Sequence, residues 1–195
     1  MSTTTTPTGP AAVDRAAALV TNAQPRCGET LVVAVDGPSG AGKSVLAAAL
    51  AERLGGVPVV HMDDIYPGWD GLVDAVPHLH DFVLAPLARG ERAAYRRFDW
   101  DRQEYAEWHE LPAARVLLVE GVGSGARQVE EYLSVLVWVE ADRDVRFARG
   151  IARDGEAYLP HWQRWAAQED AHFAADRTRD RADLVLDTTP AAERA

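Results

Sequence analysis

The sequence predicts an α/β fold in which a five-stranded parallel sheet is covered by helices on both faces. Short runs of apolar, β-branched residues alternate with helix-forming segments along the chain, as in βαβ units with parallel strands. The runs are apolar throughout, which is typical of strands buried on both faces. Acidic residues follow several of these runs directly, at the edge of a parallel sheet where ligands bind.

The first half of the chain supplies two strands and their helices. We expect a helix at 11–23, a strand at 31–35, a helix at 45–54 and a strand at 57–61. Residues 67–79 show no clear pattern, 79–88 favour a helix, and 93–99 favour an irregular strand or arm. The second strand is expected to lie beside the first, with both ending at the same edge of the sheet.

The second half of the chain supplies the other three strands. We expect strands at 116–119, 135–139 and 184–186, a short helix at 126–132, and longer helices at 142–154 and 160–175. The alternation continues to the end of the sequence, so all five strands belong to one sheet and one domain.

Length and composition suit one globular domain with at most a small lid, since the chain has 195 residues and 47% are hydrophobic. We expect a disordered tail at 1–10 and a single domain at 11–195. The tail does not resemble a signal peptide, and no apolar run reaches the length of a membrane span. A lone cysteine, Cys27, excludes a disulfide framework, and its polar turn predicts an exposed thiol. These features favour the cytoplasm.

The formal net charge of −10 disfavours nucleic acid as a partner, because an acidic surface repels phosphate backbones. Any anion that the protein binds must therefore be held by a local cluster of donors. We expect a small-molecule partner and no membrane partner, and we leave open whether the chain forms a homo-oligomer.

One motif supplies such a cluster. Residues 37–44 match G-x-x-x-x-G-K-[ST] between a predicted strand and a predicted helix. Such a loop points backbone N–H groups at phosphates, and the helix start adds its dipole. The motif predicts a three-layer P-loop NTPase fold that binds ATP and Mg²⁺. The residues expected at the nucleotide are Gly37, Pro38, Ser39, Gly40, Ala41, Gly42, Lys43, Ser44 and Val45, with Lys43 on the β- and γ-phosphates and Ser44 on Mg²⁺.

Acidic residues at strand ends are candidates for metal binding and catalysis. Glu120 ends the third strand, where a carboxylate can hold Mg²⁺; alternatively it is a solvated strand-end acid. Asp63 and Asp64 end the second strand, where one carboxylate could accept the proton of an acceptor hydroxyl and the other could bind substrate or metal. Their alternative role is to cap a helix or turn.

An arginine-rich helical face is the candidate phosphate clamp. Arg146, Arg149 and Arg153 recur at helical spacing, within a small helical lid placed at about 146–160. The alternative is ion pairing with nearby acids at 142, 144 and 154. Arg153 is the best single candidate for a catalytic arginine, and Arg149 is expected at the nucleotide.

Aromatic residues divide into core and candidate ligand-binding positions. Trp138, Trp162 and Trp165 are expected in the core, whereas Trp69 lies between glycines in a loop that could present its ring to a planar substrate. The histidines show no spacing typical of metal ligands, so we predict no zinc site.

The ordered set of features resembles the uridine kinase and nicotinamide riboside kinase group. The glycine loop, Asp63 followed by Tyr66, an arm with Phe98, Glu120-Gly121 and the helix ending at Arg153 occur in the same order. The resemblance implies that Asp63 is the catalytic base, that Tyr66 lines the nucleoside pocket and that Phe98 stacks near the nucleobase. It also implies a lid arginine at Arg153. The Asp-His-Pro-Asp-Ala motif of uridine kinases is absent from 71–77, and Gly150 stands where the group often has another arginine.

These features predict an ATP-dependent kinase that phosphorylates a hydroxyl of a small molecule, with a nucleoside such as uridine as the first expectation. One alternative is a nucleoside monophosphate kinase of the cytidylate type, in which Arg89, Arg92, Arg96 and Arg97 would face the acceptor phosphate. Another is a nucleotide-dependent switch ATPase without a small acceptor. A GTPase is disfavoured because no Asn-Lys-x-Asp motif occurs.

Overall fold

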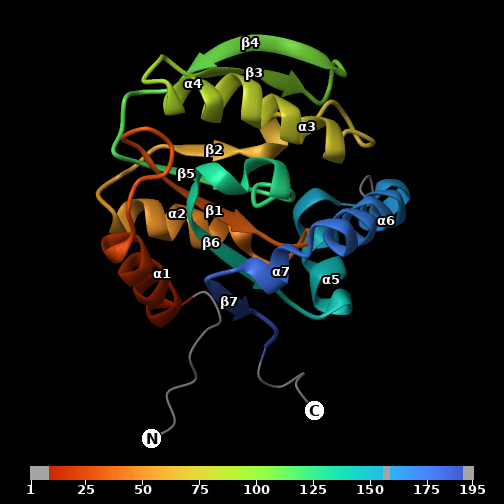
Figure 1. Cartoon of the computed structure of the whole chain (residues 1–195). Helices are drawn as coiled ribbons and strands as arrows, with labels where there is room; N and C mark the ends of the chain where they lie inside the picture. Colours follow the sequence, from red (N-terminus) through yellow and green to blue (C-terminus); the bar gives the residue numbers. More distant parts are fainter. Residues whose placement is uncertain (1–8, 156–158, 191–195) are drawn as a thin grey trace, which may run out of the picture.

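A five-stranded parallel sheet forms the centre of the molecule, as the sequence predicts (Figure 1). The structure, a computed structural model, describes residues 9–155 and 159–190. The order of strands across the sheet is β2-β5-β1-β6-β7. Their bounds are β1 (Leu31–Asp36), β2 (Val59–His61), β5 (Val116–Glu120), β6 (Leu133–Glu140) and β7 (Leu184–Asp187). Residues 1–8 of the predicted tail and 156–158 of the predicted lid lie outside the described residues, while Pro10 already belongs to the first helix.

Helices cover both faces of this sheet (Figure 1). The longer ones are α1 (Pro10–Asn22), α2 (Lys43–Arg53), α3 (Leu72–Leu79), α5 (Arg143–Asp154) and α6 (Leu159–Asp176). Short helical segments are η1 (Met62–Asp64), η2 (His80–Leu84), α4 (Ala85–Ala88), η3 (Arg127–Tyr132) and α7 (Thr178–Arg181). None of the described helices is both long and apolar enough to cross a bilayer.

The central strand β1 divides the core into two clusters, because its successive side chains point to opposite faces. Val32 and Ala34 pack with α3 and its continuation, whereas Val33 and Val35 pack with α1 and α2. Every residue of β1 is buried, which explains why its sequence is apolar rather than alternating.

The position of β2 corrects the sequence prediction. We expected β2 to lie beside β1, but β5 lies between them and pairs with both. Chain neighbours become sheet neighbours in only about two-thirds of cases, and β2 pairs through three residues alone. The expectation of a shared edge is confirmed, since His61 and Val35 are both in register with Glu120.

A continuous helical stretch from Leu72 to Ala88 replaces the helix expected at 79–88, so its predicted start is wrong. Leu72, Ala75, Val76 and Leu79 are buried at helical spacing. The proline at position 77 obscured this pattern, because proline removes a backbone donor and usually marks a helix boundary. Here the helix accommodates it before the wider turn η2.

The predicted arm is one half of a β-hairpin. Strand β3 (Ala94–Asp99) pairs antiparallel with β4 (Glu104–Glu110), and the pair lies over α3 and α4 (Figure 1). Strand β4 was not predicted, because its residues are mostly polar and none of them is buried. Tyr95 and Phe98 of β3 point into the molecule and are buried.

The expectation of an exposed thiol at Cys27 is wrong. Cys27 is fully buried in the core, and its thiol donates to the Leu84 carbonyl at 3.1 Å. Burial raises the pKa of the thiol to about 11. Polar neighbours in sequence could not reveal this packing, because the contact joins residues 57 positions apart.

Candidate active site

The glycine loop connects β1 to α2 in a conformation that requires glycine. Gly40 has φ +77°, and a Cβ there would lie 2.4 Å from the Arg146 carbonyl oxygen of α5. Gly42, with φ 99°, immediately precedes α2. These glycines let the backbone approach α5 closely and turn toward the start of α2, which is the geometry of a phosphate loop.

Three polar side chains that the sequence analysis did not assign support this loop. The buried Asp36 carboxylate accepts hydrogen bonds from the backbone N–H groups of residues 37, 123 and 125. Glu169 of α6 accepts from the Ser39 N–H at 2.8 Å. The Thr188 hydroxyl, just beyond β7, donates to the Ala41 carbonyl at 2.7 Å. Their positions at strand ends could have identified Asp36 and Thr188, whereas no local signal identifies Glu169, which lies 130 residues from Ser39.

The loop borders a cavity of about 360 Å³ that gathers most of the predicted site residues. Its lining comes from the glycine loop, the start of α2, η1, the end of β5 with the two residues after it, and α5: Ser39, Gly40, Gly42, Lys43, Ser44, Val45, Asp63, Glu120, Gly121, Val122, Arg149, Gly150 and Arg153. Gly37, Pro38 and Ala41 belong to the loop but do not line this cavity. Within the cavity, a lysine and two arginines can meet negative charge.

The arginine face of α5 packs against the glycine loop. Arg146 donates to the Ser39 carbonyl at 3.2 Å and lies 3.7 Å from the Glu169 carboxylate. Arg149 donates to the hydroxyl and carbonyl of Thr188, both at 2.9 Å. Arg149 and Arg153 line the cavity, whereas Arg146 supports the loop from outside it. The helical periodicity therefore identified one face, and packing divided it into two roles.

Glu120 and Ser44 form an oxygen-donor pair at the cavity. The Ser44 hydroxyl donates to one Glu120 oxygen at 3.2 Å, and His61 Nδ1 lies 2.7 Å from the other. The hydrogen bond to Glu120 raises the pKa of His61. Mg²⁺ binds oxygen ligands such as hydroxyls and carboxylates together with phosphate oxygens. Ser44 and Glu120 therefore fit the predicted metal. The role of His61 had no sequence signal, because it depends on the register of β2 with β5.

Replacing Glu120 with glutamine is expected to raise the Mg²⁺ concentration needed for half-maximal turnover and to lower turnover. The substitution keeps the size of the side chain and removes its charge from a buried position. A Mg²⁺ titration of activity at fixed ATP measures the effect. An unchanged titration would show that Glu120 is a strand-end acid without a metal role.

The two neighbouring aspartates face different surroundings. Asp63 lines the cavity, and Asp64 accepts a hydrogen bond from the Tyr95 hydroxyl at 3.3 Å. Asp63 is exposed where it meets the cavity, but protein surrounds it on its other sides. The surrounding protein removes water from the carboxyl group, and this desolvation is the main reason that the pKa of Asp63 lies above the usual aspartate value. The negative charge of Glu120 raises the pKa further. A raised carboxyl pKa at a cavity is typical of an acid–base group.

The other predicted substrate residues do not line the phosphate cavity. Tyr66 is buried in the core, where its hydroxyl donates to the Val122 carbonyl at 2.8 Å. Phe98 is buried inside the hairpin, and Trp69 is half-buried against the rings of Trp100 and His161. In this conformation the side chains of Tyr66 and Phe98 are packed in the core rather than exposed at the phosphate cavity.

Solved structures share this arrangement of strands and helices. A possible uridine kinase from Bacillus stearothermophilus matches with a TM-score of 0.63 at 22% identity, over 90% of this chain and 97% of that one. A provisionally assigned fructose transport system kinase from Silicibacter sp. TM1040 matches with a TM-score of 0.54 at 23% identity, over the same shares of the two chains. A search of curated proteins found no significant match.

The family assignment comes from a sequence-family model. The model of the Phosphoribulokinase / Uridine kinase family matches residues 78–192, which is more than half of the chain. The match spans the hairpin, Glu120 and the arginine face, and the glycine loop lies before it. The chain is therefore a P-loop kinase of the Phosphoribulokinase / Uridine kinase family.

Proposed function

We propose that this kinase transfers the γ-phosphoryl group of Mg-ATP to a hydroxyl of a small molecule, with nucleosides as the first acceptor class. The observation that carries the proposal is that Asp63 lines the same cavity as Lys43, Ser44 and Glu120. A carboxylate with a raised pKa thus faces the place where the phosphate loop would hold the reacting phosphate.

Each lining residue has a distinct task in this proposal. The loop N–H groups and Lys43 hold the phosphates, and Arg149 and Arg153 stabilise the negative charge that spreads over the transferring group. Asp63 orients the acceptor hydroxyl and takes its proton as the oxygen attacks phosphorus. Ser44 and Glu120 would hold Mg²⁺, which neutralises phosphate charge when bound. Positioning and charge stabilisation then supply most of the rate enhancement.

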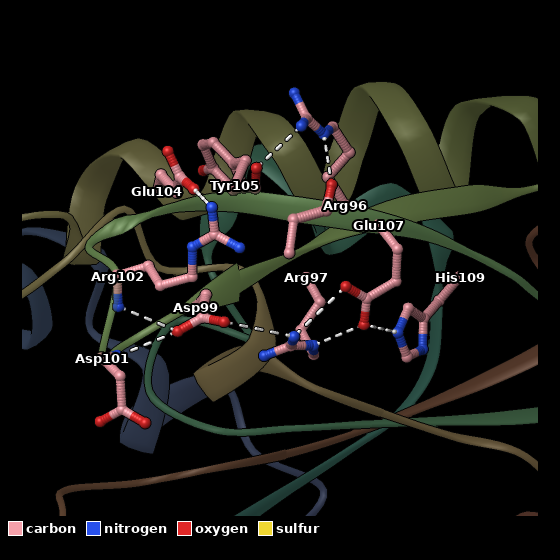
Figure 2. A network of polar contacts seen from close by, with 10 residues as sticks. Arg96, Arg97, Asp99, Asp101, Arg102, Glu104, Tyr105, Glu107 and His109 are labelled. Atoms are coloured by element: carbon pink, nitrogen blue, oxygen red, sulfur yellow. Dashed lines mark hydrogen bonds and ion pairs between the residues drawn. The ribbon is translucent and has the colours of Figure 1, made fainter.

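A nucleoside monophosphate acceptor is disfavoured by where the hairpin arginines lie. Arg97 pairs with Glu107 and Asp99, and Arg96 donates to backbone carbonyls of β4 (Figure 2). Arg89 pairs with Glu91, and Arg92 lines a different cavity, near the start of β1. None of these four arginines lines the described phosphate cavity. An acceptor without its own phosphate therefore suits the site better.

The two structural relatives suggest which acceptors to compare. One is described as a possible uridine kinase and the other as a kinase of a fructose transport system, so nucleosides and sugars form the main arms of a screen. We also propose that the protein works in the cytoplasm, where ATP and Mg²⁺ are available. A nucleoside monophosphate serves as the third arm, and ATP alone as the fourth.

The test is acceptor-dependent release of ADP from ATP and Mg²⁺. We expect a nucleoside to stimulate release well above the rate with ATP alone, and the phosphorylated nucleoside to accumulate in equal amount. If only a sugar, or only the nucleoside monophosphate, stimulates ADP release, that class is the acceptor in place of nucleosides. A slow rate that no acceptor in the panel raises would favour the switch ATPase.

A further inference from the structure

We propose that three aromatic residues, Trp69, Trp100 and His161, form an aromatic clamp that holds the Asp63 turn in a fixed position relative to helix α6. The proposal rests on the proposed function, since it treats Asp63 as the base. It assigns Trp69 and Trp100 a positioning role for catalysis, although neither residue lines the phosphate cavity.

The hairpin contacts three consecutive residues around Asp63. The indole N–H of Trp100 donates to the Asp63 carbonyl at 2.9 Å. The Tyr95 hydroxyl donates to the Asp64 carboxylate at 3.3 Å, and the Tyr105 hydroxyl donates to the Ile65 carbonyl at 3.0 Å. Two of these bonds hold backbone carbonyls, at Asp63 within the short turn η1 and at Ile65 just after it, and the third holds the Asp64 side chain. Together they fix the turn from which the Asp63 side chain projects.

Trp100 is itself held at the end of β3. Its ring meets Phe98 edge to face with centroids 5.5 Å apart, and its carbonyl accepts from the Gln103 amide. The Asp99 carboxylate accepts from the backbone N–H groups of Asp101 and Arg102, closing the hairpin turn (Figure 2). The indole N–H is therefore presented to Asp63 by a turn with its own hydrogen bonds.

Trp69 connects this hairpin to α6. Its ring centroid lies 5.0 Å from that of Trp100, and on α6 it stacks parallel to His161 at 4.3 Å and 3°. Two polar contacts reinforce the junction: the Gln168 amide donates to the Trp69 carbonyl at 2.8 Å, and Arg164 pairs with Asp70. The loop that carries Trp69 is thus fastened to α6 by both its ring and its backbone.

Helix α6 also contacts the phosphate loop. Glu169, one residue after Gln168, accepts from both the Ser39 N–H and the Trp165 indole. One rigid helix therefore contacts the phosphate loop through Glu169 and the clamp through His161. The clamp fixes the turn that carries Asp63 relative to α6, and Glu169 fixes the phosphate loop relative to the same helix. Contacts with one helix therefore position both the base and the loop that binds the phosphates. Sub-ångström placement matters at this point, because transfer requires the reacting groups to be aligned.

The test replaces Trp100 with phenylalanine, which keeps a ring and removes the N–H donor. We expect kcat for transfer to fall about 3- to 10-fold at saturating substrates, the size expected from one hydrogen bond, with the KM for ATP unchanged. Trp69→Leu should act in the same direction by breaking the link to α6. Trp108→Phe is the matched control, because Trp108 is on the same hairpin, is 53% exposed and packs on Phe82.

A double-mutant cycle with Asp63→Asn locates the effect. If Trp100 acts through Asp63, Trp100→Phe should change kcat little when Asp63 is already asparagine. An equal fold loss in both backgrounds, or a Trp100→Phe protein that behaves like Trp108→Phe, would overturn the clamp. If Asp63→Asn alone leaves transfer unchanged, the base assignment fails, and that outcome is distinct from failure of the clamp in a protein whose Asp63 is essential.

Discussion

Replacing Lys43 with methionine is expected to lower kcat by at least about 10²–10³-fold, as for removal of a preorganised charged donor from a transition state. Methionine keeps much of the length and apolar stem, so the loss isolates the charge. Lys43 is buried at the start of α2, where its amine donates to the Pro38 carbonyl at 3.0 Å. The side chain is therefore already ordered beside the loop, so that little conformational entropy is lost when phosphate binds.

Single-turnover measurements with wild type and variant at saturating ATP would determine the loss. Lys43 is the only lysine in the sequence, which provides an independent check of its location. An acyl-phosphate analogue of ATP that acylates nearby amines should modify Lys43, and excess ATP should prevent the modification. Near wild-type turnover by a folded Lys43→Met protein would contradict the proposed phosphoryl transfer.

Replacing Asp63 with asparagine is expected to lower kcat about 10²–10⁴-fold, the usual worth of a general base. Asparagine keeps the shape and an acceptor oxygen but cannot take the proton. The affinity for ATP should change little, because the loop, Lys43 and Ser44 are untouched. The measurement is kcat with the acceptor identified by the screen, together with ATP binding by calorimetry.

Asp64→Asn is the matched control for this change. Asp64 points to the Tyr95 hydroxyl rather than into the phosphate cavity, so its substitution should have a much smaller effect on kcat. Exchange of the two effects would make Asp64 the base. If neither substitution lowers kcat, the two aspartates have no role in the chemistry, and the proposal is limited to ATP binding.

Because the pKa of Asp63 is raised, the wild type and Asp63→Asn should differ in how two quantities depend on pH, kcat/KM and the Tm. The base must be ionised, so kcat/KM of the wild type should fall as the pH drops through a value above the usual aspartate pKa, and the variant should lack this limb. Because the folded protein holds this proton more tightly than the unfolded chain, stability decreases as the pH rises through that window. Asp63→Asn should therefore raise the Tm at neutral pH, and the gain should vanish below about pH 3.9.

The features that could be predicted from the sequence are the ones that depend on neighbouring residues in the chain. The glycine loop is one contiguous stretch between a strand and a helix, so its residue types carry its phosphate-binding geometry without reference to the rest of the chain. The buried strands were equally legible, because burial on both faces demands apolar residues throughout. Strand-end position was enough to single out Asp63 and Glu120, since parallel strands bring their carboxyl ends to one edge.

Features that depend on contacts between distant segments of the chain could not be predicted and are known only from the folded structure. The order of strands placed β5 between β1 and β2, which brought His61 to Glu120. Packing of α6 carried Glu169 to Ser39, and the hairpin carried Trp100 to Asp63, 37 residues away. Tyr66 and Phe98 had the residue types of a pocket lining, yet packing buried both. A side chain has the same local sequence whether it faces a ligand or the core, and the neighbours that decide between the two come from elsewhere in the chain.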